Sequence, residues 1–403
     1  MPKIVQINST LNWGSTGRIA EEIGQILIDE GSESYIAYGR YVNQSLSENI
    51  KIGNKWDVYH HVLQTRLFDR HGLASRKATR QLIKRIKEIN PDIIHLHNIH
   101  GYYLNYPILF EYLASSRIPV VWTLHDCWSF TGHCAHYMGI NCTKWKTQCR
   151  NCPQKDSYPS SLLFDNSKNN FLFKQKYFQS VDNLTLVPVS SWLVNELQKS
   201  FLHKVPSCII HNGIDINIFC PLPSIKSKLN LYNSFLILGV SSVWTERKGL
   251  SDFVELRKLL PKNYSIVLIG LTSKQIKVLP EGIIGIERTN NVEELAAYYS
   301  SADVFFNPTW EDTFPTTNLE ALACGTPVIT YRTGGSPEAI DEHTGFVVEP
   351  GNLEEAVRVM EQIKSVGKNK YTQACRERAV KNFNKKDRYA DYLQLYNKIL
   401  NSK

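Results

Sequence analysis

The sequence predicts an α/β protein with two doubly wound Rossmann-like domains, and three observations lead to this fold class. A chain of 403 residues is too long for one hydrophobic core. Short runs of β-branched and aromatic residues alternate with helix-length segments, which is typical of parallel sheets covered by helices. This alternation stops once, at the prolines and polar residues that follow position 220, and then begins again.

The first domain is predicted over residues 1–220 and the second over 221–384, followed by a helix at 385–403 that packs back across the join. A basic amphipathic helix is expected at 76–89. In open α/β sheets ligands bind beyond the carboxyl ends of the strands, so two such domains facing each other predict a cleft. The expected strands are 3–7, 35–39, 92–99, 119–126 and 184–190 in the first domain, and 235–242, 264–270, 283–286, 303–308 and 327–332 in the second.

The composition is that of an ordinary globular protein, with 42% hydrophobic and 21% charged residues. No uncharged apolar run is long enough to span a bilayer. The first ten residues indicate a strand and not a signal peptide, so a cytoplasmic location is predicted. The net charge of +8 suits nucleotide, phosphate or anionic membrane partners, and no nucleic-acid partner is expected.

The helix expected at 76–89 lies in a strongly basic segment, residues 69–90. Its isoleucines and leucine recur at helical spacing, while lysines and arginines occupy the other positions. The simpler interpretation is a solvated helix packed on a sheet. The functional alternative is a surface that meets anionic lipid or a phosphorylated acceptor, with the protein peripheral at the inner face of the membrane.

The most informative stretch is "PTWEDTFPTTNLEALACGTPVITYRTGGSPEAI" (308–340). A strand is expected to end at Pro308 and a helix to begin near Thr316. Backbone N–H groups at a helix start are unpaired, so they form a natural phosphate site. Asp312 and Glu320 are eight positions apart on either side of that helix start, where carboxylates can accept hydrogen bonds from sugar hydroxyl groups.

Several shorter motifs accompany this stretch in order along the chain. "GSTGR" (14–18) follows the first strand and opens a helix, "TLHD" (123–126) ends another strand, and "HNGID" (211–215) and "ERKG" (246–249) follow. Together with "TGGSPE" (333–338), they resemble the motifs of the retaining GT-B glycosyltransferases of family 4. "HDCWSFTGHC" and "EDTFPTT" resemble the subgroup of bacterial capsule and exopolysaccharide clusters, including colanic-acid-type enzymes.

The resemblance implies a two-domain GT-B fold and a role for each matching residue. Glu320 would hold the donor ribose, and Asp312 would contact the donor sugar. Lys248 would neutralise the diphosphate, and His125 would lie beside the reacting sugar. Backbone amides would cradle the diphosphate near Gly14, Gly17, Thr316 and Thr317.

The sequence departs from the family pattern at two positions. Asp312 stands where the family has its first glutamate, so Glu311 is a second candidate for contact with the donor sugar. The family's arginine before the lysine is replaced by Ser242 and Val243, and Arg247 is the candidate to compensate.

The implied activity is transfer of a sugar from a UDP- or GDP-sugar to a hydroxyl of a growing glycan, and the implied acceptor is linked to undecaprenyl diphosphate. No Asp-x-Asp motif is present, so no metal cofactor is expected for catalysis. Developing charge on the leaving diphosphate would be stabilised by cations and amides. The alternatives are a GT-B nucleotide-sugar epimerase and a non-catalytic subunit derived from a transferase.

Four of the nine cysteines fall within residues 131–155, in a polar insertion predicted over residues 127–155. Their spacing, Cys-x7-Cys-x6-Cys-x2-Cys, ends in a two-residue gap that lets two thiolates face one ion. A structural zinc that clips the loop is the favoured prediction, with reduced thiols and disulfides as alternatives and His133 and His136 as spare ligands. The predicted ligands are Cys134, Cys142, Cys149 and Cys152.

Overall fold

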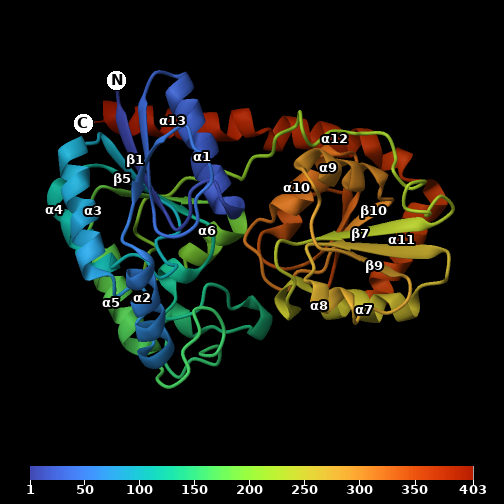
Figure 1. Ribbon diagram of the computed structural model, residues 1–403, viewed down its shortest axis with the longest axis horizontal. Helices are drawn as coiled ribbons and strands as arrows, with labels where there is room; N and C mark the ends of the chain where they lie inside the picture. Colours follow the sequence, from blue (N-terminus) through green and yellow to red (C-terminus); the bar gives the residue numbers. More distant parts are fainter. Residues whose placement is uncertain (403) are drawn as a thin grey trace. The chain divides into compact units, whose positions relative to one another are not determined.

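Two six-stranded parallel sheets organise the protein, shown in Figure 1 as a computed structural model that describes residues 1–402. The first unit contains Met1–His211 together with the C-terminal residues from Tyr389 onward, and the second contains Asn212–Arg388. Each unit has its own sheet with helices on both faces, so the predicted α/β, doubly wound class is confirmed.

The sheet of the first unit has the strand order β3-β2-β1-β4-β5-β6, and every neighbouring pair is parallel. Strand order therefore reverses between β1 and β4. Its strands are β1 (Lys3–Asn8), β2 (Glu33–Tyr38), β3 (Glu48–Lys51), β4 (Ile93–Leu96), β5 (Val120–Leu124) and β6 (Leu184–Pro188). Its helices are α1 (Gly14–Asp29), α2 (Lys55–Phe68), α3 (Arg76–Ile89), α4 (Tyr106–Ser116), α5 (Ser167–Phe178) and α6 (Ser191–Leu197), with 3-10 turns η1 (Trp128–Phe130), η2 (Met138–Ile140) and η3 (Lys144–Lys146).

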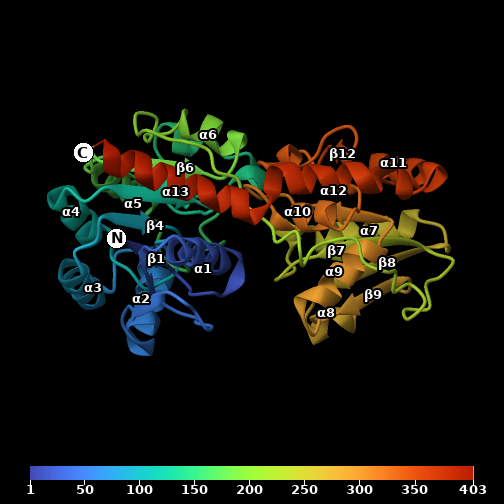
Figure 2. The ribbon, with the colours of Figure 1, turned by 90° about the horizontal axis from the view of Figure 1, so that it is seen from above.

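Helix α13 (Lys385–Asn401) returns the chain to the first unit (Figure 2). Three tyrosines of α13, spaced three and four residues apart, join isoleucines of α1 and the central strands in one apolar cluster. Two of them also bond to the sheet: the Tyr392 hydroxyl lies 3.0 Å from Thr123 Oγ1, and the Tyr396 hydroxyl lies 2.6 Å from His95 Nδ1. The C-terminal helix is therefore part of the first unit's core.

The second unit repeats the plan with the order β12-β11-β10-β7-β8-β9, again all parallel, and its reversal lies between β7 and β10. Its strands are β7 (Phe235–Val240), β8 (Tyr264–Ile269), β9 (Ile283–Ile286), β10 (Val304–Asn307), β11 (Val328–Tyr331) and β12 (Gly345–Val348). Its helices are α7 (Leu250–Leu259), α8 (Ser273–Ile276), α9 (Val292–Ser301), α10 (Thr316–Ala323), α11 (Leu353–Val366) and α12 (Asn369–Phe383), with 3-10 turns η4 (Glu246–Lys248) and η5 (Ser336–Ala339).

The ten predicted strands are all present, while β3 and β12 were not predicted. Both are four-residue strands at the edge of a sheet, where one side has no partner strand to impose a strong apolar pattern. The change of unit falls between His211 and Asn212, before the predicted boundary at 220. The reason is local pairing, because Ile214 forms a parallel bridge with Asn384 and so belongs to the second unit.

Helix α3 spans Arg76–Ile89, as predicted for the basic amphipathic helix. Leu82, Ile86 and Ile89 are buried, and the lysines and arginines are exposed. The apolar face of α3 is therefore used inside the fold, and its accessible face is almost entirely cationic. No helix among residues 1–402 combines the length and apolar character needed to cross a lipid bilayer.

Candidate functional site

In the second unit, the predicted donor-binding residues gather where the strand order reverses. The turn η4 follows β7, and the loop 308–315 follows β10. The carboxyl ends of two strands that diverge in this way leave a natural ligand-binding position between their loops. Lys248 and Asp312, which are 64 positions apart in the sequence, meet here.

Gly249 allows the two loops to approach each other. Its φ of +75° is a left-handed conformation, and a Cβ added there would lie only 2.3 Å from the Pro308 carbonyl oxygen. The close approach places Lys248 Nζ 2.5 Å from Asp312 Oδ2, with both side chains about one-fifth exposed. An ion pair that keeps some access to solvent can rearrange around an incoming anion.

Arg247 holds the same two loops together. Its Nη1 donates to the Glu311 carbonyl at 2.8 Å, and its own carbonyl accepts from Trp310 N at 2.9 Å. The arginine thus adds a positive charge beside Lys248 while it positions the backbone of the acidic pair. Glu311 is buried and Asp312 is half-buried, so Asp312 is the more accessible of the two carboxylates.

Helix α10 begins at Thr316, as predicted, and its first turn carries no side-chain cap. Pro315 occupies the N-cap position and provides no side chain that bonds the first N–H groups, and the first turn has no acidic residue. Such a helix start attracts anions through its N–H groups and its dipole. Glu320 lies one turn further along and is buried, where it accepts a 2.7 Å hydrogen bond from the Tyr299 hydroxyl.

The first unit places its own predicted residues at the carboxyl edge of its sheet. Gly14 and Gly17 lie in the first turn of α1, directly after β1, and Trp13 at the N-cap provides no side-chain bond. A Cβ on Gly17 would come within 2.7 Å of Thr10 Oγ1, so a larger residue would push the loop away from the helix. This turn is a second uncapped helix start, as the predicted amide cradle requires.

His125 follows β5 and is held by a chain of hydrogen bonds. Gln6 Nε2 donates to the Ala20 carbonyl at 2.8 Å, which leaves Gln6 Oε1 to accept from His97 Nε2 at 2.9 Å. A neutral imidazole carries one N–H, so His97 Nδ1 accepts from His125 Nε2 at 3.2 Å. The chain therefore assigns the N–H of His125 to Nε2.

Burial keeps these imidazoles neutral. It lowers the pKa of His125 to about 4 against a smaller opposing effect of Asp126, and it lowers the pKa of His97 well below its ordinary value. Burial acts to raise the pKa of Asp126, but His100, His136 and the hydrogen bond from Trp128 N together outweigh it and lower that pKa. His97, His100, His125 and Asp126 line one small cavity at the ends of β4 and β5. A neutral hydrogen-bonding group can recognise a sugar hydroxyl without binding a diphosphate.

The four cysteines predicted as zinc ligands surround a second small cavity, together with His133. All are free thiols. Among residues 1–402, however, no three His, Cys, Asp or Glu side chains form a group that could hold a metal ion. The four thiols are thus near one another without the arrangement of a metal site. The hydrogen bond from Cys134 lowers the pKa of the Cys152 thiol to about 7, and Cys149 Sγ accepts from Gly132 N at 3.2 Å.

Bound zinc remains a prediction, and one further feature of the insertion bears on it. His133 Nδ1 lies 2.6 Å from the buried Asp69 carboxylate, whereas His133 Nε2 is buried without a hydrogen-bond partner. A carboxylate behind one imidazole nitrogen is the arrangement that orients a histidine ligand toward a metal. His136, the other spare candidate, lies close enough to Asp126 to help lower the pKa of that carboxylate.

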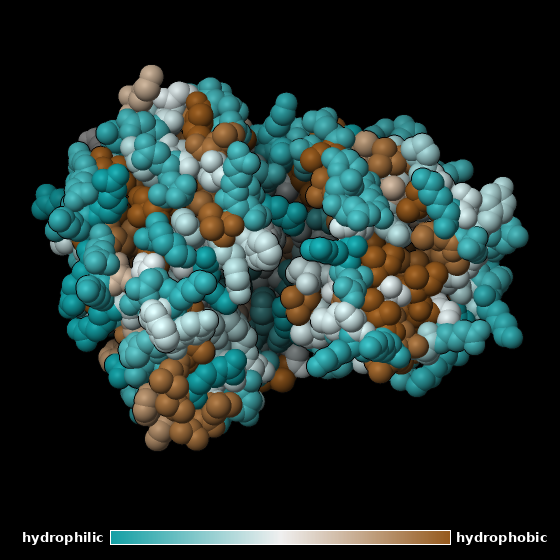
Figure 3. All heavy atoms as spheres, in the orientation of Figure 1, coloured by the Kyte–Doolittle hydropathy of each residue, from teal (hydrophilic) through white to brown (hydrophobic). Residues whose placement is uncertain are grey.

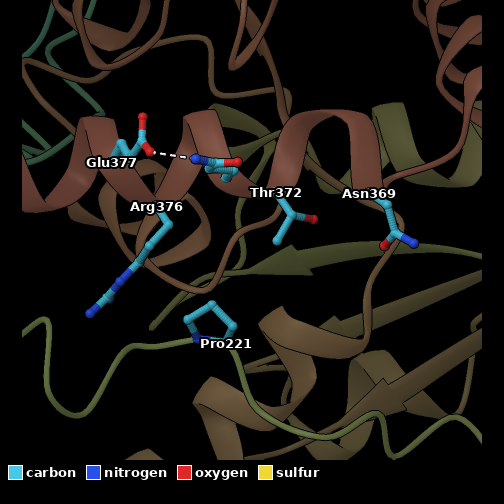
Figure 4. Close-up of a pocket in the computed structure, with 6 residues that line it drawn as sticks. Pro221, Asn369, Thr372, Arg376 and Glu377 are labelled. Carbon is cyan, nitrogen blue, oxygen red and sulfur yellow. Dashed lines mark hydrogen bonds between the residues drawn. The ribbon is translucent and has the colours of Figure 1, made fainter.

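A further pocket of about 460 Å³ lies in the second unit beside α12 and contains none of the predicted residues (Figure 4). Arg376, which lines it, donates to the carbonyls of Ile216, Phe219 and Ala323. Its guanidinium is thus committed to fastening the 212–220 segment and the end of α10 to α12. We therefore interpret this pocket as a structural feature.

Sequence reasoning missed three residues that support the site: His97, Gln6 and Tyr299. His97 could have been found, since "HLHN" ends a predicted strand that neighbours the strand of His125. Gln6 lies inside a buried apolar strand, where a polar side chain needs a partner. Nothing near Tyr299 in the sequence connects it to Glu320.

Two family models match the chain, one in each half. The model described as Glycosyltransferase Family 4 matches residues 16–218, and the model described as Glycosyl transferases group 1 matches residues 234–365. The first alone spans half of the chain. Each match falls almost entirely within one of the two structural units.

A relative of similar length is the putative colanic acid biosynthesis glycosyl transferase WcaC of Escherichia coli (strain K12). It is 24% identical over 372 residues, which cover 88% of this chain and 89% of the relative. A shorter match is the sulfoquinovosyl transferase SQD2 of Arabidopsis thaliana, 41% identical over 204 residues, which cover 41% of this chain and 40% of the relative.

Solved structures share the whole fold at low sequence identity. Sucrose-phosphate synthase from Thermosynechococcus elongatus aligns with a TM-score of 0.75 at 16% identity and covers all of both chains. Anabaena Alr3699/HepE in complex with UDP-glucose aligns with a TM-score of 0.66 at 15% identity, again over both full chains. These likenesses establish the fold.

Proposed function

The chain belongs to glycosyltransferase family 4 and has the predicted GT-B fold, and from this premise we propose a specific reaction. The protein transfers a sugar from a nucleoside diphosphate sugar to a hydroxyl group of an acceptor glycan, with retention of the anomeric configuration. The donor is a UDP- or GDP-sugar. The structure of Anabaena Alr3699/HepE with UDP-glucose supports this donor class, since that protein shares the fold.

The observation that carries the proposal is the anion site of the second unit. A cation at Lys248, a second at Arg247 and the uncapped start of α10 lie around the strand-order reversal. A diphosphate placed there would compete with Asp312 for Lys248 and would release that carboxylate toward the donor sugar. Glu320 would then be available to the ribose hydroxyl groups, since it already accepts a hydroxyl hydrogen bond from Tyr299.

The proposed step needs positioning and charge stabilisation. The bond between the sugar C1 and the diphosphate oxygen breaks with its electron pair on that oxygen. The acceptor oxygen bonds to C1 on the same face, and its proton passes to the departing phosphate oxygen. Lys248, Arg247 and the amides of α10 stabilise the charge that develops on the leaving group, which is the role a divalent cation has in other transferases.

The acceptor proposed here is a growing, lipid-linked bacterial surface glycan of the capsule or exopolysaccharide kind. The likeness to a putative colanic acid transferase over most of both chains supports this class. In the first unit, His125 and Asp126 bring a neutral imidazole, whose N–H is donated to His97, and a carboxylate to the same small cavity, where both can accept hydrogen bonds from sugar hydroxyl groups. Neutral imidazoles beside the reacting sugar match an uncharged acceptor hydroxyl.

The test is native mass spectrometry of the full chain with UDP-, GDP-, dTDP- and CMP-sugars. We expect one nucleoside diphosphate sugar to bind at 1:1 and the CMP-sugar, which has one phosphate, to bind much more weakly. Glu320→Ala and Lys248→Ala should each weaken binding at least about tenfold, because each removes a charged hydrogen-bonding group. Lys258→Ala, which changes an exposed lysine paired with Glu255, is the matched control.

Three outcomes would contradict the proposal. A folded chain that binds none of these donors would remove the anion site from the mechanism. NMR of the anomeric proton would show whether the donor is converted to its epimer when no acceptor is present. Such conversion would favour the epimerase alternative. Activity that survives a chelator is expected, and strict dependence on added Mg²⁺ or Mn²⁺ would refute the metal-independent step.

A further inference from the structure

Helix α2 exposes an apolar face that the fold does not cover. Trp56, Tyr59 and Leu63 recur at spacings of three and four, so they share one side of the helix. They are 77%, 63% and 52% exposed. The rings of Trp56 and Tyr59 are 6.0 Å apart and pack against each other instead of against the core. The opposite side of the helix carries the buried His61 and Thr65, so the orientation of α2 is fixed.

A second exposed apolar group lies at the end of α2. Leu162, Leu163 and Phe164 follow one another in the loop before α5, and all are more than half exposed. Phe164 stacks on Phe68, the last residue of α2, with ring centroids 5.8 Å apart. Leu162 N donates to the Arg66 carbonyl at 2.7 Å, so the loop is fastened to the helix by its backbone as well.

We call these seven residues, three on the face of α2, three in the loop and Phe68, the apolar patch. In Figure 3, apolar side chains gather at the lower margin of the first unit, over the region where Figure 1 shows α2. Three consecutive exposed large apolar residues at the end of a helix that also exposes an aromatic face are uncommon on a protein that has no partner for them. The patch therefore indicates an interaction surface.

Positive charge dominates the segment that contains α2 and α3. Residues 55–90, which include α2 and the adjacent α3, hold nine lysines and arginines against three acidic residues. The start of α3 is joined to α2 by a 2.8 Å hydrogen bond between His61 Nδ1 and Ser75 Oγ. At the loop, Lys155 Nζ donates to the Leu162 carbonyl at 3.1 Å and also lies 3.5 Å from the exposed Asp156 carboxylate, so the charge beside the leucines is a lysine–aspartate pair and the excess of cations comes from α2 and α3.

We propose that the apolar patch and the basic face of α3 form a docking surface for an anionic lipid bilayer. The aromatic and leucine side chains would enter the interface between headgroups and acyl chains, and the α3 cations would bind the headgroups. This inference deepens the proposed function and rests on it, since a lipid-linked acceptor is presented at such a surface. In this proposal α2 and the loop make the apolar contact with the membrane, and α3 makes only the electrostatic contact.

The charge pattern favours a bilayer over a second copy of the chain. A symmetric dimer through this patch would bring two strongly basic α2–α3 regions together. Like charges facing across an interface weaken that pairing and select against it. An anionic membrane satisfies both the apolar and the cationic groups.

The experiment is flotation of the full chain with vesicles of phosphatidylcholine alone or mixed with phosphatidylglycerol. We expect flotation with the anionic vesicles, weakened by salt. Leu162→Ser with Leu163→Ser and Phe164→Ser should reduce the partition coefficient at least about tenfold, because three apolar side chains no longer enter the interface. Arg80→Glu with Lys84→Glu should reduce it mainly at low salt. The control is Val278→Ser with Leu259→Ser, which changes exposed apolar residues of the second unit.

Each outcome bears on the proposal. Quenching of Trp56 fluorescence by brominated lipid, lost in Trp56→Phe, would support it. Absence of flotation, or flotation unaffected by the loop variant, would overturn it, as would a dimer that the loop variant dissociates. Donor binding separates the two proposals. A chain that floats with anionic vesicles but binds no donor would support the docking surface and contradict the proposed function. A chain that binds a donor but does not float would contradict the docking surface alone.

Discussion

The two units have sheets of the same topology but carry different side-chain chemistry at the carboxyl edges of those sheets. Eleven of the twelve histidines lie in the first unit, and several are buried around its site. The second unit has one histidine, which is exposed, and its site is built from Lys248, Asp312 and an uncapped helix start. Each sheet has one reversal of strand order, between β1 and β4 in the first unit and between β7 and β10 in the second.

The difference indicates a division of labour within one fold plan. Fixed cations and helix N–H groups suit a diphosphate, whose charge depends little on pH near neutrality. Neutral imidazoles whose tautomers are fixed by hydrogen bonds suit hydroxyl groups, because an uncharged hydroxyl is recognised by the direction of a hydrogen bond and not by an opposite charge. The fold thus provides two equivalent positions, and the side chains decide which ligand each position can hold.

The largest expected effect concerns the charged site of the second unit. Lys248→Ala should lower kcat/KM by about 10²–10³, because it removes a preorganised cation from the leaving group. Lys258→Ala should leave kcat/KM unchanged. The measurement is steady-state transfer with the donor identified by mass spectrometry. Equal losses in both variants would mean that the ion pair with Asp312 has no special role.

The next effect tests the cysteine insertion, which is the feature that most distinguishes the first unit from the second. If zinc closes the loop from Cys134 to Cys152, its removal should cost about 3 kcal/mol, as for a closed loop of similar length. Intact-mass and metal analysis should find one zinc per chain, lost in Cys152→Ser and kept in Cys208→Ser. A metal-free chain in which all the thiols react would refute the zinc clip.

Acid should destabilise the first unit selectively. Unfolded histidines bind a proton near pH 6.5, but burial keeps the pKa of His125 at about 4 and those of His61 and His95 at about 3. Between these values the unfolded chain binds more protons, so the free energy of unfolding falls as pH falls, by up to about 1.4 kcal/mol per pH unit for each histidine. Hydrogen exchange followed by mass spectrometry should show earlier opening in peptides of the first unit. Equal loss of protection in both units would contradict this origin.

The smallest effect concerns the hydrogen-bond chain behind His125. His97→Phe should lower kcat/KM about fivefold, the value of one hydrogen bond, because His125 loses the acceptor that fixes its N–H at Nε2. Gln6→Leu should act in the same direction through His97. His97→Asn should recover part of the activity, since it keeps an acceptor. A His97→Phe chain with unchanged activity would limit His97 to a packing role.

Local sequence patterns determined most of the secondary structure and the donor-side residues. The alternation of apolar and helical segments was enough to predict ten strands, and the start of α10 at Thr316 follows from Pro315 and the polar residues around it. The short edge strands were missed because their pattern is weak. The family motifs indicated Lys248, Asp312 and Glu320 before any geometry was known.

Only the tertiary structure decided which of these residues act together. Nothing local links Lys248 to Asp312, Gln6 to His97 or Phe68 to Phe164, because each pair is joined by packing between distant segments. The same holds for exposure: the periodicity of α3 predicted an amphipathic helix, but only the fold shows that its apolar face is buried while that of α2 is not. Sequence periodicity sets which side of a helix is apolar, and the positions of the neighbouring elements set whether that side meets the core or the solvent.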